Sequence, residues 1–341
     1  FIALGTSHKY SSVSLRERIY FSRKDILSAL KRLKASGLID EVAILSTCNR
    51  LEIYACADEA ETDILLLSGF LAQTKNIDWE SLAASFYYFD NVSAVEHLFL
   101  VACGLDYLIV GERQVTYQVM NALCLSRGAN AAGGLINEIF TQACFLSDKL
   151  RAKYPFFSEG LSVGSAAFEF IKKNVPDLSN KKLLIVGTGK VSELLIDCLK
   201  KEKLEAVFIS SRTFEKAAKF ADAVGGRAFR FDELGYMLKE SDIVITATRS
   251  PGPIITKKDI EGLRKPILII DLAMPRDVDS SVKEVAGVEL YNLDDLGLAG
   301  FGKLNAQQAG IREIEEIISE KAQSLCHIGQ LSLGYAQAPL R

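Results

Sequence analysis

The pattern of apolar and polar positions in the second half of the chain repeats strand and helix. Between residues 181 and 290, short apolar runs alternate with stretches whose apolar positions have helical spacing. Buried strands that alternate with amphipathic helices are typical of a doubly wound parallel sheet. We therefore predict a Rossmann-like α/β domain over residues 154–290. Its strands are expected at 183–186, 206–210, 243–247 and 267–271, and its helices at 162–173, 192–200 and 215–224.

The first half of the chain predicts a separate α+β domain over residues 1–153. Ser14 stands three residues before Glu17, the spacing of a capping box, so a helix is expected to begin there. Strands are expected at 1–5, 41–46 and 51–55, and helices from Ser22 to a stop at Gly37 and, with interruptions around Gly104 and Gly111, over 93–150.

A long amphipathic helix is predicted past Tyr291, beginning near Asn305. Such a helix needs an apolar surface to cover its stripe. Only a short tail, Leu331 to Arg341, is expected beyond it, so residues 291–341 form a predicted third part. The apolar stripe consists of Ile311, Ile314, Ile317, Ile318 and Leu325.

Composition narrows the class of protein. The hydrophobic fraction of 49% and charged fraction of 24% are typical of folded proteins, and no run approaches the ~18–20 apolar residues of a membrane span. Seven cysteines without CxxC spacing argue against a disulfide framework and a zinc site. No export signal is visible, so a reduced, cytoplasmic location is expected. The net charge of −3 gives no global sign of a nucleic-acid partner, so any RNA contact is expected to be local.

A glycine loop follows the first strand of the second domain and opens a helix. Backbone amides and the helix dipole can hold a pyrophosphate there, although an ordinary turn is the plainer alternative. The strand–loop–helix context favours nucleotide binding, with Ser192 in the place of the usual third glycine. The predicted cofactor residues in this loop are Gly187, Thr188, Gly189, Lys190, Val191 and Ser192.

The end of the next strand carries Ser211 and Arg212 where an NAD-binding protein offers an acidic residue. An arginine there suits the 2′-phosphate of NADPH, and Lys216 lies one helical turn later. The alternative is that Arg212 is a solvated surface charge.

Cys48 follows a predicted strand, beside the positive charge of Arg50, which would favour the thiolate. A single cysteine is more often a small buried hydrophobe, and His97, on an apolar helical stripe, is more often a core histidine. The stretch from Gly104 to Gln118 has the composition of a ligand-facing loop, with polar residues at Asp106, Glu112, Arg113, Gln114 and Gln118.

Together these segments resemble the glutamyl-tRNA reductase family, in order along nearly the whole chain. The motifs that carry the resemblance are residues 5–9, 14–18, 46–50, 52–54, 104–106, 111–112, the glycine loop at 187 and residues 271–278. The resemblance implies NADPH-dependent reduction of glutamyl-tRNA to glutamate-1-semialdehyde, the first step of tetrapyrrole synthesis. Cys48 would form a thioester and release the tRNA.

The resemblance also implies roles for other residues. Arg50 would hold the substrate γ-carboxylate, and His97 would assist proton movement. Thr47, Asn49, Glu112, Gln114 and Gln118 would fix the α-amino group and the ester. The long helix would feed a dimerisation region that this chain truncates. A homodimer and an aminomutase that takes the aldehyde are the implied protein partners, with NADPH as cofactor and no metal.

Three departures lie in the substrate segment. Tyr107 stands where the family usually has a small serine, Arg113 replaces a proline and Tyr117 replaces a glycine. We place Tyr107 and Arg113 among the substrate-binding residues, where added bulk would crowd a glutamyl pocket. Two alternatives therefore stay open: a degenerate, non-catalytic paralogue that binds NADPH or partner proteins, and a reductase of another acyl ester that needs no tRNA.

Overall fold

The computed structural model describes residues 1–56, 60–109, 111–154, 162–175, 177–200, 204, 206–297 and 308–336. The chain divides into two compact units. Unit 1 comprises residues 1–160 with 304–341, and unit 2 comprises residues 161–303. The predicted boundary at residue 290 therefore falls thirteen residues before the end of unit 2, and the C-terminal helix belongs to unit 1.

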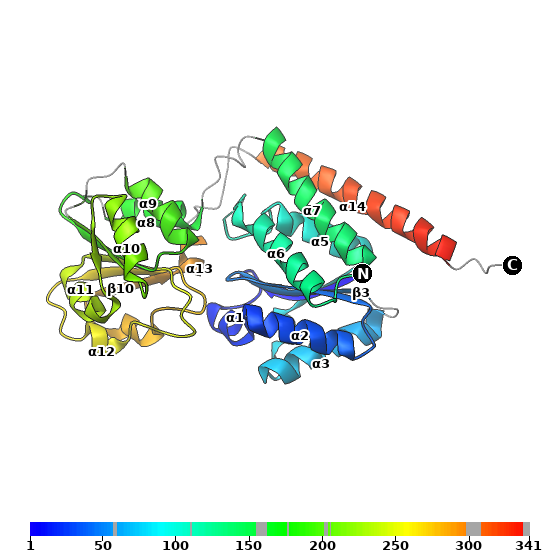
Figure 1. Ribbon diagram of the computed structural model, residues 1–341, viewed down its shortest axis with the longest axis horizontal. Coiled ribbons are helices and arrows are strands. Elements are labelled where there is room, and N and C mark those ends of the chain that lie inside the picture. Colours follow the sequence, from blue (N-terminus) through cyan, green and yellow to red (C-terminus); the bar gives the residue numbers. More distant parts are fainter. Residues whose placement is uncertain are drawn as a thin grey trace. The chain divides into compact units, whose positions relative to one another are not determined.

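Unit 1 is built on a four-stranded antiparallel sheet with the order β2-β3-β1-β4. The strands are β1 (Ile2–Ser7), β2 (Glu41–Ser46), β3 (Arg50–Cys56) and β4 (Tyr87–Asp90). Successive side chains point to opposite faces, so Ala3 and Tyr54 join one apolar core while Leu4 and Ile53 join another. The sheet is thus buried on both faces, as Figure 1 shows.

Helices cover both faces of this sheet. One core includes residues of α1 (Val13–Ile19), α2 (Arg23–Ala35) and α3 (Ala60–Lys75), and the other includes residues of α5 (Asn91–Ala102), α6 (Gln114–Gly128) and α7 (Gly134–Lys153). The short α4 (Trp79–Leu82) and the 3-10 turn η1 (Ala83–Ser85) precede β4. The α+β prediction for this region is confirmed, although α3 and β4 were not predicted.

The predicted start of the first helix was wrong by two residues. Ser12, not Ser14, is the N-cap of α1, and its hydroxyl accepts the backbone N–H of Leu15. Ser14 lies inside the helix instead, so it is not the residue that caps the free backbone N–H groups of the first turn. The start of α2 is confirmed, because Ser22 and Asp25 form its capping box.

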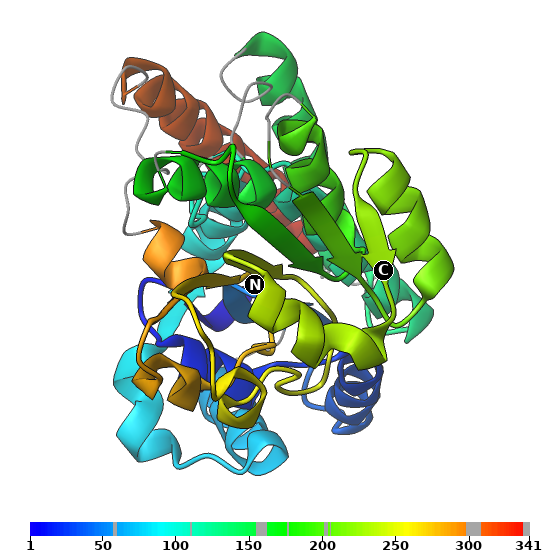
Figure 2. The same ribbon diagram turned by 90° about the vertical axis from the view of Figure 1, so that its left-hand side faces the viewer.

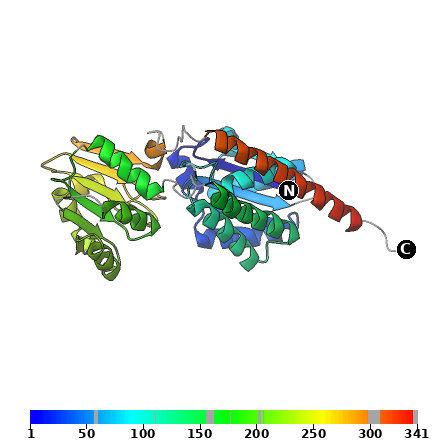
Figure 3. The ribbon, with the colours of Figure 1, turned by 90° about the horizontal axis from the view of Figure 1, so that it is seen from above.

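The C-terminal helix α14 (Gln308–Ala336) packs on unit 1. Ile314, Ile318 and Ala322 are fully buried in the core formed with α5 and α7. Figures 1 and 3 show the helix alongside α5 and α7, with its last turns extending past them. The apolar stripe predicted for this helix therefore packs against α5 and α7. The tail predicted from Leu331 is still helical as far as Ala336, and the predicted start near Asn305 lies outside the described residues.

Unit 2 contains a six-stranded parallel sheet with the order β10-β9-β8-β5-β6-β7, which confirms the doubly wound fold. Helices lie on both faces of it (Figure 2). The strands are β5 (Lys182–Val186), β6 (Ala206–Ser210), β7 (Arg227–Phe229), β8 (Ile243–Thr246), β9 (Ile267–Asp271) and β10 (Val288–Asn292). The helices are α8 (Val163–Asn174), α9 (Lys190–Leu199), α10 (Phe214–Asp222), α11 (Leu234–Glu240), α12 (Lys257–Ile260) and α13 (Leu293–Leu296), with 3-10 turns η3 (Phe231–Glu233) and η4 (Ser280–Glu284).

The two edge strands β7 and β10 were missed because neither has a buried apolar run: β7 has three residues, and β10 is only partly buried. Among the described residues, no helix combines the length and the apolar character needed to cross a bilayer.

Candidate active site and nucleotide pocket

The tight turn between β2 and β3 presents Cys48. The hydroxyl oxygen of Thr47 accepts the backbone N–H groups of Asn49 and Arg50 at 3.1 and 3.2 Å, which fixes the turn. Thr47 and Asn49 are buried, while Cys48 between them is partly exposed. Its Sγ lies 3.7 Å from the hydroxyl oxygen of Tyr107. The turn therefore holds a partly exposed cysteine on a hydrogen-bonded support.

The pKa of Cys48 is raised, whereas the sequence predicted that the thiolate would be favoured. Burial raises the pKa of this thiol above its ordinary value, against opposing effects from the Tyr107 hydroxyl and the Arg16 guanidinium. Arg16, on α1, is fixed to the same turn because its Nε donates to the carbonyl oxygen of Cys48 at 3.2 Å. The guanidinium of Arg50, which was expected to favour the thiolate, pairs with Glu52 and Asp106 instead.

Arg50 is buried in an ion-pair cluster. Its Nη1 lies 2.7 Å from a carboxylate oxygen of Glu52 and 3.1 Å from one of Asp106. Its Nη2 donates to the backbone oxygen of Asp106, and Lys9 also pairs with the Asp106 carboxylate. Both terminal nitrogens of the guanidinium, which were expected to be free to bind the substrate carboxylate, are therefore already paired with Glu52 and Asp106.

Glu52 is the centre of this cluster and is fully buried. Tyr54 and Tyr87 donate their hydroxyls to its carboxylate, and Nε2 of His97 lies 2.8 Å from it. Although burial acts to raise the pKa of Glu52, Arg50 and His97 hold that pKa well below its usual range. A side chain at Gly5, opposite Glu52 in the sheet, would collide with it at 2.7 Å.

His97 is thus placed as a buried partner of Glu52. It is 7% exposed and stacks on Phe89 with ring centroids 4.5 Å apart. Its contacts with Glu52, Tyr87 and Phe89 place it in the aromatic and ionic core rather than against the sulfur of Cys48. Sequence reasoning did not include Glu52 among the functional residues, because a charged residue on a strand gives no sign of burial until the fold is known.

The loop before α6 brings further predicted residues to the same place. Tyr107 and Glu112 are buried, and Glu112 accepts the backbone N–H of Gln114 at 3.2 Å. The charge of Glu112 acts to raise the pKa of both Cys48 and Tyr107.

Four buried polar atoms around this turn have no hydrogen-bond partner among the described residues. They are Nδ1 of His8, Nδ2 and Oδ1 of Asn49, and Nε of Arg50. In α6, Nε2 of Gln114 and Oε1 of Gln118 are likewise without a partner among the described residues. Native proteins satisfy nearly all buried polar groups. A cluster of unsatisfied donors and acceptors beside a partly exposed thiol is therefore the arrangement expected of a polar ligand site.

Two of the three departures do not crowd this site. Arg113, at the N-cap of α6, is exposed, and Tyr117 is 67% exposed. The expectation that they would narrow a glutamyl pocket is therefore not supported, whereas Tyr107 does lie against Cys48.

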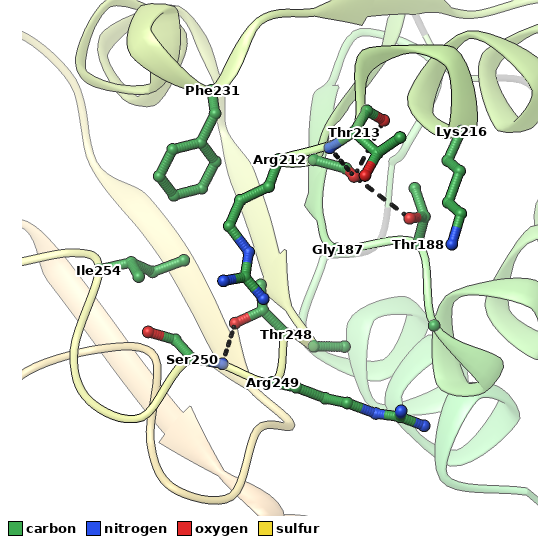
Figure 4. Close-up of a pocket in the computed structure, with 13 residues that line it drawn as sticks. Gly187, Thr188, Arg212, Thr213, Lys216, Phe231, Thr248, Arg249, Ser250 and Ile254 are labelled. Carbon is green, nitrogen blue, oxygen red and sulfur yellow. Dashed lines mark hydrogen bonds between the residues drawn. The ribbon is translucent and has the colours of Figure 1, made fainter.

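Unit 2 contains a cavity of about 550 Å³ at the carboxyl ends of β5, β6 and β8, where ligands bind in doubly wound sheets (Figure 4). Gly187 lies in its wall with φ +113°, and a Cβ there would lie 2.5 Å from the carbonyl oxygen of Ala247. Six of the predicted cofactor residues line the cavity, namely Gly187, Thr188, Gly189, Ser211, Arg212 and Lys216.

The other three predicted cofactor residues do not line the cavity. Lys190 is exposed and pairs with Glu193 at 2.9 Å, Val191 lies in the first turn of α9, and Ser192 is fully buried. Sequence reasoning missed the turn after β8, which supplies Thr248, Arg249 and Ser250. Asp277, buried beneath this turn, accepts the backbone N–H of Thr248 at 2.8 Å. The carboxyl-end rule for parallel sheets would have identified this turn.

Three positive side chains face the cavity. Figure 4 shows Arg212 reaching toward Thr248 and Ser250, while Lys216 extends beside Thr188. Arg249 supplies the third charge. The cavity is therefore suited to an anionic ligand such as a dinucleotide.

Comparison with known proteins follows the two-unit division. Residues 4–154 match the family model described as glutamyl-tRNAGlu reductase, N-terminal domain, and residues 169–298 match the one described as shikimate / quinate 5-dehydrogenase. The chain is 36% identical to the glutamyl-tRNA reductase of Priestia megaterium over 319 residues, which cover 92% of this chain and 72% of that protein. The chain belongs to the glutamyl-tRNA reductase family.

Other members of the glutamyl-tRNA reductase family match over a similar span. The protein of Bacillus subtilis is 33% identical over 94% of this chain and 71% of its own length. Among solved structures, the glutamyl-tRNA reductase from Methanopyrus kandleri matches with a TM-score of 0.51 and 31% identity, covering 95% of this chain and 79% of that one. The matched span includes both the Cys48 turn and the cavity of unit 2.

Proposed function

We propose that this chain reduces glutamyl-tRNA to glutamate-1-semialdehyde with NADPH, releasing tRNA, as the first step of tetrapyrrole synthesis. The observation that carries the proposal is the partly exposed thiol of Cys48 beside buried polar atoms that lack partners. A thiol alone would suit many reactions. Membership of the glutamyl-tRNA reductase family selects this substrate and favours catalysis over a degenerate, non-catalytic role.

The chemistry begins with Cys48 as thiolate. Its sulfur attacks the carbonyl carbon of the glutamyl ester, the bond to the tRNA ribose oxygen breaks, and that oxygen takes a proton as it leaves. NADPH supplies the hydride that reduces the resulting thioester carbon. The carbon–sulfur bond then breaks, which frees the aldehyde and restores the thiolate.

The substrate residues are assigned from the same turn and loop. Gln114 and Gln118 each have a buried amide atom without a partner among the described residues, and with Thr47, Asn49 and Glu112 they would bind the α-amino group and the ester. For the γ-carboxylate, the free donor of Arg50 is Nε, since the other guanidinium nitrogens are bound to Glu52 and Asp106. His97 would act through Glu52 as a positioning residue.

The cavity of unit 2 fits a phosphorylated dinucleotide. The glycine loop ending β5 allows a pyrophosphate to approach the backbone at the start of α9. Arg212 and Lys216, which follow β6 and line the cavity, would bind a 2′-phosphate, and this favours NADPH over NADH. The resemblance also predicts a homodimer and a partner aminomutase, which light scattering and pull-down with the purified aminomutase would test.

The deciding experiment measures glutamate-1-semialdehyde formed from the purified chain, NADPH and glutamyl-tRNA. Uncharged tRNA with free glutamate is the control. Product that requires charged tRNA is expected. Equal product from a simple glutamyl ester without tRNA would instead support the alternative of a general acyl-ester reductase, and no product from folded, NADPH-bound protein would overturn the proposal.

A further inference from the structure

Tyr107 is the side chain in contact with the Cys48 sulfur. It comes from the loop after α5, is 5% exposed, and places its hydroxyl oxygen 3.7 Å from Sγ. Its ring also faces the Arg50 guanidinium, whose central carbon lies 5.8 Å from the ring centroid. The ring is thus held on one side by packing with a cation, and its hydroxyl oxygen lies within hydrogen-bonding distance of the thiol.

The direction of the hydrogen bond follows from the two groups. Burial, together with the neighbouring Cys48, raises the pKa of Tyr107 well above its ordinary value, so the phenol keeps its proton. A thiolate has no proton to give and accepts strongly. When Cys48 is ionised, Tyr107 is therefore the donor and the sulfur is the acceptor.

The surroundings leave few other groups to favour the thiolate. Glu112 opposes ionisation, burial opposes it more, and Arg50 is turned to its own carboxylates. The groups that act in favour are the Tyr107 hydroxyl, the Arg16 guanidinium and the local backbone, with the Tyr107 contribution the largest of them. Arg16 also donates to two backbone carbonyl oxygens, at Ser11 and Cys48.

We propose that Tyr107 is a catalytic residue of this chain, whose hydroxyl donates a hydrogen bond to the Cys48 thiolate and holds it in position to attack the ester. This inference rests on Cys48 being the nucleophile of the proposed function. It gives a role toward Cys48 to a residue that was predicted to bind the substrate and whose bulk was expected to crowd the glutamyl pocket. No proton is transferred in this step, because the phenol stays neutral throughout.

The test is the pH dependence of Cys48 alkylation in Tyr107→Phe, with the modified peptide quantified by mass spectrometry. Iodoacetamide reacts with the thiolate, so the rate against pH reports the ionisation of this one thiol. Loss of one hydrogen bond to an ion predicts an upward shift of about one pH unit, or about tenfold slower alkylation near pH 7. The exposed Cys124 is an internal control whose rate should not change.

Tyr236→Phe, at an exposed tyrosine in unit 2, is the matched control and should leave the Cys48 profile unchanged. An unshifted profile in a folded Tyr107→Phe protein, or an equal shift in Tyr236→Phe, would overturn the proposal. Should the phenylalanine variant fail to fold, the natural chain grown with fluorotyrosine tests the same bond. Its more acidic phenol is a stronger donor, so the midpoint should fall, and no change would count against the proposal.

Alkylation needs neither tRNA nor NADPH, so its result is independent of whether the chain reduces glutamyl-tRNA. Where reduction occurs, Tyr107→Phe should lower kcat near neutral pH and recover as the pH rises. The KM for glutamyl-tRNA should change little. A purely steric role of Tyr107 would change KM and leave the pH profile where it was.

Discussion

Arg50 and Glu52 form an ion pair of 2.7 Å in which neither side chain is exposed to solvent. The two residues are neighbours on the same face of β3, directly after the turn that carries Cys48. Burying a pair of charges is costly unless further hydrogen bonds satisfy both partners. Here Asp106 adds partners for Nη1 and Nη2 of the guanidinium, whose Nε has none among the described residues, and two tyrosines with His97 complete the carboxylate. The turn therefore rests on a buried polar core in which the loss of one partner leaves another buried charge incompletely paired.

Replacing Glu52 tests that dependence. Glu52→Gln keeps the volume but leaves Arg50 buried with an incomplete partner, so unit 1 should lose about 3–5 kcal/mol of unfolding free energy. Urea unfolding followed by the fluorescence of Trp79, the one tryptophan and part of unit 1, measures this directly. Glu313→Gln, which breaks the exposed pair with Lys153, is the control and should lower the unfolding free energy far less. Equal losses in both variants would contradict the account.

Cys48→Ser should abolish aldehyde formation and leave NADPH affinity nearly intact. A hydroxyl at this position keeps the turn but is a far weaker nucleophile at neutral pH. Coupled measurement of product and of cofactor binding separates the two effects. Cys124→Ser, at an exposed cysteine, should keep full activity. Turnover by the Cys48 variant above a few per cent of the natural chain would remove the assignment of the nucleophile.

Arg212→Ala should weaken NADPH binding by about tenfold or more, the usual effect of losing one charge-assisted hydrogen bond, and affect NADH much less. Arg212 lines the cavity, whereas the exposed Arg227 of the same unit does not appear in its wall and is the matched control. Titration followed by cofactor fluorescence gives the dissociation constants for NADPH and for NADH. If affinity for NADH fell as much as affinity for NADPH, Arg212 would not be reading the 2′-phosphate.

The lowered pKa of His8 predicts that the stability of unit 1 depends on pH. Burial and the nearby Arg50 lower the pKa of His8 from 6.5 to about 4. The unfolded chain therefore takes up a proton between about pH 6.5 and 4 that the folded unit refuses, so this residue reduces stability as the pH falls through that window. His8→Gln should become more stable relative to the natural chain as the pH is lowered, by Trp79 fluorescence. His327→Gln, at an exposed histidine on α14, is the matched control.

The parts of the fold that depend on local pattern could be predicted. The parallel sheet and the turn at Cys48 follow from apolar runs and turn residues a few positions apart. The burial of Arg50 could not be predicted, because its carboxylate partner Asp106 lies 56 residues away, and His97 lies 45 residues from Glu52. Whether Arg50 is free for substrate depends on those long-range contacts. Arg249 is a different case, because it lies in the turn at the carboxyl end of β8, where the rule for parallel sheets would have identified it.

Gly187→Ala should abolish nucleotide binding without unfolding unit 2. The added Cβ would lie 2.5 Å from the carbonyl oxygen of Ala247, and φ +113° is strained for any residue with a side chain. The loop must therefore move out of the cavity wall, and the amides at the start of α9 lose their position. Gly235→Ala in α11, where an added Cβ meets nothing within 4 Å, is the matched control and should bind NADPH normally. Calorimetric titration with NADPH and circular dichroism of both variants distinguish lost binding from lost folding. Normal binding by Gly187→Ala would mean that the dinucleotide does not lie against this loop.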